Sequence, residues 1–218
     1  MKVIDDKNKQ LYWYNRNIFW ITSILYCLLL IFLFIPTAKA PHDIFFERVE
    51  KIRNLDFKVM GYLREWLVNL LGLYSHGSWE HVLHNCLGIL LGSVYIERKY
   101  GSFNMFLIFV GLTCLCMFDG GGIGNSYIWF ALWGFVIIDF IWSLFTKERN
   151  LANILFGSIT LVLEYFRSGF FDTASGGIGW GIEPYQLIYN RGHYIGFIMG
   201  IFLCIVIRII MTGRKKQS

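Results

Sequence analysis

The stretch GGGIGNSYIWFALWG, residues 120–134, places one serine between a glycine-rich loop and a strongly apolar segment. The apolar segment continues to residue 145 and contains a single charged side chain, that of Asp139. Its length matches the roughly 20 residues that a helix needs to cross a bilayer. The stretch therefore predicts a membrane-spanning helix that begins at Ser126. The glycines would let irregular backbone dip toward that end, which is tolerated at membrane depth only where protein or water covers it.

The composition of the 218-residue chain also indicates a membrane protein. Hydrophobic residues make up 56% of the chain and charged residues 16%, and the mean hydropathy is +0.49. A soluble domain is closer to about 45–50% apolar. The length suits one domain, and the sequence has no internal repeat that would favour an inverted-repeat transporter. We therefore predict an all-α membrane protein in which residues 1–218 form a single domain.

Six apolar segments follow one another, and each is predicted to form a membrane helix of one bundle. They run over residues 18–35, 81–96, 103–118, 126–145, 151–166 and 192–211. The first could instead be a cleaved signal peptide, because an A-x-A pattern follows it at residues 38–40. Its apolar run is longer than the roughly 7–15 residues of a signal sequence, which favours a retained helix.

Basic residues predict how the six helices are oriented, because Lys and Arg concentrate in cytoplasmic connections. They gather in both tails, in the connection after the second segment and in the connection after the fourth. Six spans put all four groups on one side. The prediction is an integral, multi-pass protein with cytoplasmic tails at residues 1–16 and 212–218 around a core of residues 17–211. From its size we expect a bacterial cell membrane.

Two long connections fall on the opposite, external side in this arrangement. The first, residues 39–80, mixes charged and apolar residues and predicts short helices lying in the membrane interface. The second, residues 167–192, is rich in glycine.

Polar groups inside these segments are costly at membrane depth, so each needs a reason. His81 and Asn85 open the second segment and share one helix face at i, i+4. His193 opens the sixth segment, where Gly196 and Gly200 form a G-x-x-x-G that lets another backbone approach closely. Taken separately, interhelical hydrogen bonding and helix packing explain these residues.

Taken together, the polar residues suggest chemistry, because the predicted orientation puts all of them at external helix ends. A histidine can take the hydroxyl proton of a serine, so Ser126 and His193 are a candidate nucleophile–base pair. Asn85 and His81 could donate hydrogen bonds to a developing oxyanion. A helix that begins at Ser126 adds free N–H groups and the positive end of its dipole.

Four motifs between residues 76 and 200 resemble those of the rhomboid intramembrane serine proteases. HGSWEHVLHN resembles H-x-x-x-x-H-x-x-x-N (His76, His81, Asn85), and ERKYG resembles E-x-x-x-G (Glu97, Gly101). GNSYIWFALWG is similar to G-x-S-G-x-x-x-A/G-L-x-G (Gly124, Ser126, Ala131, Leu132, Gly134), and HYIGFIMG resembles H-x-x-G-x-x-x-G (His193, Gly196, Gly200). The four motifs occur in the family's order.

The resemblance implies a six-helix rhomboid-like bundle with a long first external loop. Its Ser126–His193 dyad would cleave transmembrane segments of membrane-protein substrates in a water-filled cavity. Asn85, His81 and the Ser126 N–H would hold the oxyanion, and Phe130 would stack on the histidine. The resemblance implies no cofactor and no metal, and the partners would be transmembrane substrates and the lipid bilayer. The net charge of +5 does not indicate nucleic acid, because the basic residues lie at the ends of apolar segments.

Two positions depart from the family pattern. Tyr127 replaces the glycine that follows the serine, and it shares a stripe with Ala131 and Gly134. A tyrosine facing the sixth helix would push the helices apart or need a compensating gap. This favours the alternative of a weak or inactive rhomboid-like pseudoprotease that binds transmembrane helices. The family's Trp–Arg pair in the first loop is also absent, since Arg64 and Trp66 stand in reversed order.

Other polar residues have less specific interpretations. The spacing of His76, His81 and His84 is not H-E-x-x-H, so a metalloprotease is not favoured. Asp139 is expected to be solvated or to pair helices, and Glu97 to be a structural hydrogen-bonding group. The remaining expectations are that Glu164 and Arg208 extend toward the interface, and that all five cysteines are small buried hydrophobes. A small transporter or channel is a third, weaker class.

Overall fold

The computed structural model describes residues 20–38, 41–53, 61–118, 125–146, 151–167 and 191–215. Within these ranges the chain forms helices and short turns and no strand, which confirms the all-α prediction. The helices are α2 (Ile21–Phe34), η1 (Ile35–Thr37), α3 (Pro41–Arg53), α4 (Gly61–Tyr74), α5 (Trp79–Tyr100), α6 (Ser102–Phe118), α7 (Ser126–Phe145), α8 (Leu151–Arg167) and α10 (Arg191–Lys215). The predicted N-terminal tail and the glycine-rich stretch 120–124 lie outside the described residues. Helix α10 continues past its predicted end at residue 211.

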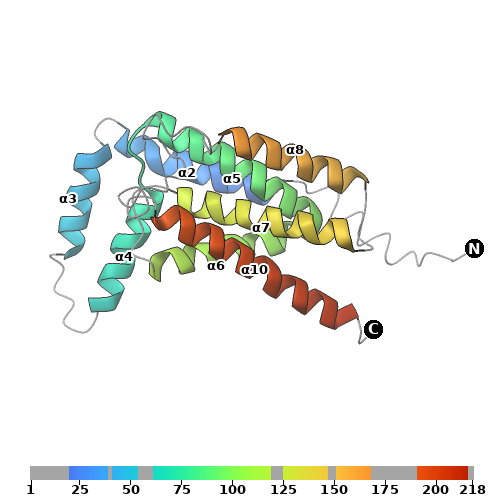
Figure 1. Ribbon diagram of the computed structural model, residues 1–218. Coiled ribbons are helices and arrows are strands. Elements are labelled where there is room, and N and C mark those ends of the chain that lie inside the picture. Colours follow the sequence, from blue (N-terminus) through green and yellow to red (C-terminus); the bar gives the residue numbers. More distant parts are fainter. Residues whose placement is uncertain are drawn as a thin grey trace, which may run out of the picture.

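Each of the six predicted apolar segments coincides with one helix of a single bundle (Figure 1). Two described segments are long and apolar enough to cross a bilayer: Ser126–Phe145 and Gly192–Ile210. The apolar stretches in α2, α6 and α8 are shorter. Two further helices, α3 and α4, come from the predicted first loop and lie at one end of the bundle (Figure 1).

Helix α7 is the central element of the bundle. It contacts α5, α6, α8 and α10, and its residues from Tyr127 to Val136 are all buried. Many of these side chains are large and aromatic, and Trp129, Phe130 and Phe135 are among the largest fully buried ones. The core of the protein therefore surrounds the half of α7 that begins at Ser126.

Helices α7 and α10 approach so closely that their backbones touch. A Cβ atom added at Gly196 would collide with the carbonyl oxygen of Tyr127, and one at Gly200 with that of Ala131. In the other direction, a Cβ atom on Gly134 would collide with the carbonyl oxygen of Phe197. The predicted stripe of Tyr127, Ala131 and Gly134 is thus the surface of α7 that packs on the G-x-x-x-G of α10.

The E-x-x-x-G motif has a structural role, as predicted for Glu97. The buried Glu97 carboxylate accepts the N–H groups of Thr22 and Ser23 at 3.0 Å each. These are first-turn N–H groups of α2, which has neither an N-cap hydrogen bond nor an acidic residue there. A carboxylate at that position satisfies the free donors and complements the helix dipole. Gly101 ends α5 with φ 88°, a conformation that favours glycine.

A buried ionic cluster joins α5, α7 and α10 at the other half of α7. Asp139 is fully buried and accepts hydrogen bonds from Tyr95 Oη (2.8 Å), Lys99 Nζ (2.7 Å), Tyr100 Oη and Arg208 Nε (2.9 Å). The alternative that Asp139 pairs helices is confirmed, and the alternative that it is solvated is wrong. The expectation that Arg208 extends to the interface is also wrong, because its residue is only 3% exposed. A carboxylate buried at this depth keeps its charge only when cations and donors surround it.

Two further expectations concern Glu164 and the five cysteines. The side chain of Glu164 lies outside the described residues. Of the five cysteines, Cys114 is exposed rather than buried, while Cys27, Cys86, Cys116 and Cys204 are buried.

The ionic cluster predicts that replacing Asp139 lowers the unfolding free energy more than replacing Arg208. Asp139→Leu leaves the Lys99 and Arg208 cations facing each other without a carboxylate, and we expect it to cost about 3–5 kcal/mol of unfolding free energy. Arg208→Met leaves the Lys99–Asp139 pair in place, and we expect a smaller loss of about 1.5–3 kcal/mol. Denaturant unfolding in detergent micelles measures both values. Lys51→Ala removes the exposed Glu47–Lys51 pair of α3 and should change nothing measurable. Equal losses for Asp139→Leu and Arg208→Met would contradict the proposed charge balance.

Candidate active site

Ser126 and His193 meet where α7 and α10 begin. His193 Nε2 lies 2.8 Å from Ser126 Oγ, which is a hydrogen bond. Ser126 is the first residue of α7, and His193 lies in the first turn of α10. The close packing of α10 on α7 through Gly196 and Gly200 holds these two helix ends side by side. The prediction that the hydroxyl and the imidazole are within hydrogen-bond reach is confirmed.

The imidazole of His193 is held by an aromatic ring. Phe130, one turn after Ser126, stacks on it with ring centroids 4.4 Å apart and an interplanar angle of 15°. Phe130 is itself fully buried, so it limits tilting of the imidazole plane. In the described part of the chain, His193 Nδ1 is buried without a hydrogen-bond partner. The arrangement there is a serine–histidine pair rather than a triad.

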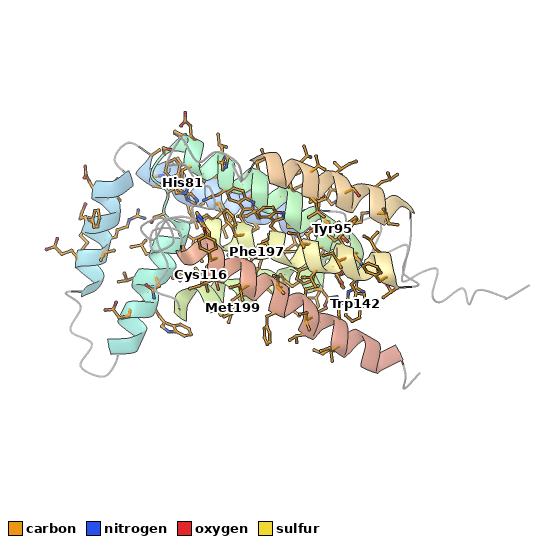
Figure 2. All side chains as sticks on the ribbon, in the orientation of Figure 1. His81, Tyr95, Cys116, Trp142, Phe197 and Met199 are labelled. Carbon is orange, nitrogen blue, oxygen red and sulfur yellow. The ribbon has the colours of Figure 1, made fainter. Side chains whose placement is uncertain are left out.

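Asn85 and His81 come to the same end of the bundle on the first turns of α5. Ser78 caps α5 by accepting the N–H of His81 at 3.1 Å, which sets where this helix begins. Figure 2 shows His81 at the end where α4 packs, with Trp142 of α7 toward the opposite end. The four predicted site residues therefore lie at one end of three neighbouring helices, α5, α7 and α10.

The side-chain amide of Asn85 is a buried hydrogen-bond donor. Its residue is 1% exposed, and its Nδ2 has no hydrogen-bond partner among the described residues. A buried amide donor without a partner costs free energy, so such groups are rare and often functional. For His81, the Gly77 N–H lies 3.5 Å from Nδ1, a long contact in which Nδ1 acts as the acceptor when the proton is on Nε2. In that neutral tautomer Nε2 is a donor.

His76 and His84 pack against rings. His84 lies edge-on to Trp129 with centroids 5.2 Å apart, and His76 lies edge-on to His81 at 5.1 Å. Burial, and secondarily the neighbouring His81, lowers the pKa of His76 to about 3, so it is neutral. Within the described ranges, no three His, Cys, Asp or Glu side chains come together in a group that could hold a metal ion.

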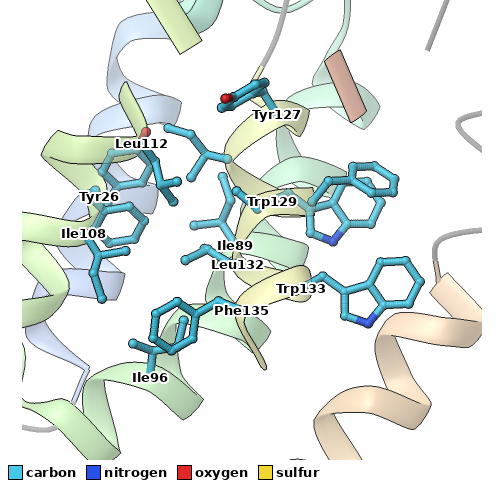
Figure 3. Close-up of a cluster of buried hydrophobic side chains, with 14 of the residues drawn as sticks. Tyr26, Ile89, Ile96, Ile108, Leu112, Tyr127, Trp129, Leu132, Trp133 and Phe135 are labelled. Atoms are coloured by element: carbon cyan, nitrogen blue, oxygen red, sulfur yellow. The ribbon is translucent and has the colours of Figure 1, made fainter. Parts of the chain in front are cut away.

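Tyr127 does not separate the two helices, so the first of the two alternatives, that a tyrosine here pushes them apart, is wrong. Its backbone, rather than its ring, faces Gly196, and the glycine lets the chains touch. The residue is 4% exposed and belongs to the hydrophobic core. Figure 3 shows it at the start of α7, in one buried cluster with Tyr26, Ile89 and Leu112. At the other departure from the family pattern, Trp66 is half-buried in α4 and the side chain of Arg64 lies outside the described residues.

Two residues next to the site were missed by sequence reasoning. Asn125 directly precedes Ser126, is fully buried, and donates from Nδ2 to Tyr26 Oη of α2 at 2.9 Å. The asparagine in GNS was visible as a polar residue beside the serine. Its partner lies 99 positions away in an apolar segment, and no local pattern connects the two.

A cavity of about 410 Å³ lies between α2 and α6, and of these two residues Tyr26 lines it while Asn125 does not. Tyr26 and Tyr74 line it together with apolar side chains that include Leu25, Phe106 and Phe109. Neither Ser126 nor His193 lines this cavity, so the hydroxyl–imidazole pair belongs to a different part of the bundle.

Comparison of the chain with family models, with curated proteins and with solved structures gives no match.

The neutral state of His76 predicts how stability responds to acid. Its pKa of about 3 lies below the ordinary value of 6.5, so between these values the unfolded chain binds more protons than the native one. Its contribution to stability is complete above pH 6.5 and is lost as pH falls toward 3, at up to about 1.4 kcal/mol per pH unit. The slope of unfolding free energy between pH 6.5 and 4.5 in detergent should be shallower for His76→Phe. An identical slope in both proteins would show that His76 does not titrate in this way.

Proposed function

We propose that this chain is a rhomboid-type intramembrane serine endopeptidase that cleaves transmembrane segments of membrane proteins. The observation that carries the proposal is the 2.8 Å contact between Ser126 Oγ and His193 Nε2. Among the described residues, it joins the starts of the two helices that are long and apolar enough to span a bilayer. The four family-like motifs support the same proposal, because three of them contribute residues to this site or to the α7–α10 packing. The fourth, with Glu97, holds the start of α2 against α5.

The reaction starts from a neutral His193 whose Nε2 accepts the Ser126 hydroxyl proton. As Oγ attacks the carbonyl carbon of the scissile peptide bond, the imidazole takes this proton as a general base. His193 then gives the proton to the leaving amine, which breaks the C–N bond and leaves an acyl ester on Ser126. A water molecule hydrolyses the ester with His193 again acting as base. Stacking on Phe130 keeps the imidazole facing the hydroxyl in both steps.

The oxyanion of each tetrahedral intermediate needs preorganised donors. Asn85 Nδ2 is such a donor, since it is buried and has no partner among the described residues. His81 supplies a second donor through Nε2, and the Ser126 N–H at the start of α7 supplies a third. A negative charge is also favoured at that end of α7 by the helix dipole.

The membrane arrangement in this proposal is a six-helix bundle formed by α2, α5, α6, α7, α8 and α10. Both tails are cytoplasmic, which puts the Ser126 end of the bundle on the external side of a bacterial cell membrane. The Asp139 cluster then lies nearer the cytoplasmic side. Substrates are transmembrane helices that can unwind near a small residue, because the scissile carbonyl must reach Ser126.

The proposal is tested with a serine-directed fluorophosphonate probe and a model transmembrane substrate in liposomes. We expect the probe to label the wild-type protein and the substrate to be cleaved, and both signals to disappear in Ser126→Ala. Ser93→Ala is the matched control, because Ser93 is a buried serine of α5 whose hydroxyl donates within its own helix. That variant should keep both signals.

Two other results would overturn the proposal. Capture of the substrate helix without labelling or cleavage would identify a pseudoprotease. Cleavage that persists in Ser126→Ala would remove Ser126 as the nucleophile.

Asn85 gives a prediction that separates catalysis from folding. Asn85→Leu removes an oxyanion donor, and we expect kcat to fall about 100- to 1,000-fold with KM nearly unchanged. Because the amide donor has no described partner, its replacement should leave the unfolding midpoint in detergent unchanged or raise it. Kinetics in liposomes and thermal unfolding measure the two effects. A loss of activity that tracks a loss of folded protein would assign Asn85 a packing role instead.

A further inference from the structure

Asn125 occupies an unusual position for a residue that precedes a helix. It is the N-cap of α7, where the side-chain oxygen of an asparagine normally accepts an N–H of the first turn. Here the side chain makes no such hydrogen bond, and the backbone has φ −92° and ψ 16°. Its Nδ2 points instead to Tyr26 Oη at 2.9 Å. The residue beside the proposed nucleophile is thus held by a different helix.

Tyr26 is itself firmly placed. Its ring stacks on Phe109 of α6 with centroids 4.0 Å apart and an interplanar angle of 2°. Tyr74, the last residue of α4, packs against the Tyr26 ring with centroids 6.5 Å apart and an interplanar angle of 53°. The hydroxyl that receives the Asn125 hydrogen bond is therefore positioned by packing from α4 and α6 as well as by α2.

The backbone of Asn125 is held as well, because its carbonyl oxygen accepts the N–H of Trp129 at 3.2 Å. With both the side chain and the carbonyl engaged, little freedom is left at the residue bonded to Ser126. The position of the first residue of α7 sets two distances at once. One joins Ser126 Oγ to His193 Nε2, and the other joins the Ser126 N–H to an oxyanion.

We infer that Tyr26 is a positioning residue, which acts through its hydrogen bond to Asn125 to hold Ser126 in register with His193. The inference rests on the proposed protease function. Misplacement of a reacting group by about 1 Å can cost about 100-fold in rate, and loss of one anchor among several permits a smaller shift. Tyr26→Phe removes only the accepting hydroxyl and keeps the ring stacked on Phe109.

The test compares Tyr26→Phe, Asn125→Leu and the double variant in liposomes. We expect each single variant to lower kcat and the rate of fluorophosphonate labelling about tenfold, with KM within twofold of the wild type. The double variant should be no slower than the slower single variant, because both changes remove the hydrogen bond between Asn125 and Tyr26. Tyr26→Phe also removes the contacts of the hydroxyl with Tyr74 and Thr113.

Tyr95→Phe is the matched control. It also removes one buried tyrosine hydroxyl, which donates to Asp139, about 20 Å along α7 from Ser126 at 1.5 Å per residue. Tyr95→Phe should lower the thermal unfolding midpoint about as much as Tyr26→Phe does, while its kcat stays at the wild-type value. A purely structural role of Tyr26 would give this same result for Tyr26→Phe and would overturn the inference.

The remaining outcomes are also decisive. Losses that multiply in the double variant would show that Tyr26 and Asn125 act separately, which overturns the inference. If Asn125→Leu does not purify as folded protein, the comparison of kcat between Tyr26→Phe and Tyr95→Phe decides the inference by itself. Cleavage that survives Ser126→Ala defeats the proposed function, whereas wild-type kcat in Tyr26→Phe with an inactive Ser126→Ala defeats only the positioning role.

Discussion

The backbone contact between α7 and α10 is the constraint on which the rest of the structure depends. Gly196 and Gly200 on one helix and Gly134 on the other allow carbonyl oxygens to lie where any side chain would collide. Small residues are what let membrane helices approach this closely. The contact places the starts of the two helices together, and the 2.8 Å separation of Ser126 and His193 follows from it. A larger residue at these glycines would have to move a whole helix rather than one side chain.

The two buried carboxylates Asp139 and Glu97 differ from Asn85 and His193 in their hydrogen-bond partners. Around Asp139 and Glu97, each carboxylate is surrounded by donors from neighbouring helices. At the Ser126 end, Asn85 Nδ2 and His193 Nδ1 have no partner within the described residues. Pairing of buried polar groups stabilises a fold, while unpartnered ones cost stability and tend to occur where function needs them. This contrast suits a bundle that is stabilised by its paired carboxylates and keeps the Asn85 amide donor available near Ser126.

The role of Tyr127 shows how a residue substitution can be misjudged from its position on a helix. The stripe Tyr127, Ala131 and Gly134 was predicted correctly as the surface facing α10, and a bulky member of that stripe suggested separated helices. A residue on a contact stripe can turn its side chain aside and present only its backbone. Gly196 makes this possible, because it has no side chain and its contact is with the backbone of Tyr127 rather than with the ring.

The sequence by itself determined where the helices lie and which residue types stand at their ends. Apolar length locates a membrane helix, and the start of α7 at Ser126 was predicted from it. The candidate residues Ser126, His193, Asn85 and His81 were likewise visible, because polar groups in apolar segments are costly.

Only the tertiary structure decided the side-chain contacts that no sequence motif indicated. Arg208 pairs with Asp139 rather than extending to water, and Asn125 pairs with Tyr26 rather than capping its own helix. The physical reason lies in the helices themselves. From Tyr127 to Val136, α7 is apolar and buried all round, so apart from the stripe that faces α10 no pattern in its sequence specifies which side chains meet α5, α6 and α8. The rotation of α7 about its axis is set by packing against four neighbours at once, and it determines every contact between side chains distant in sequence.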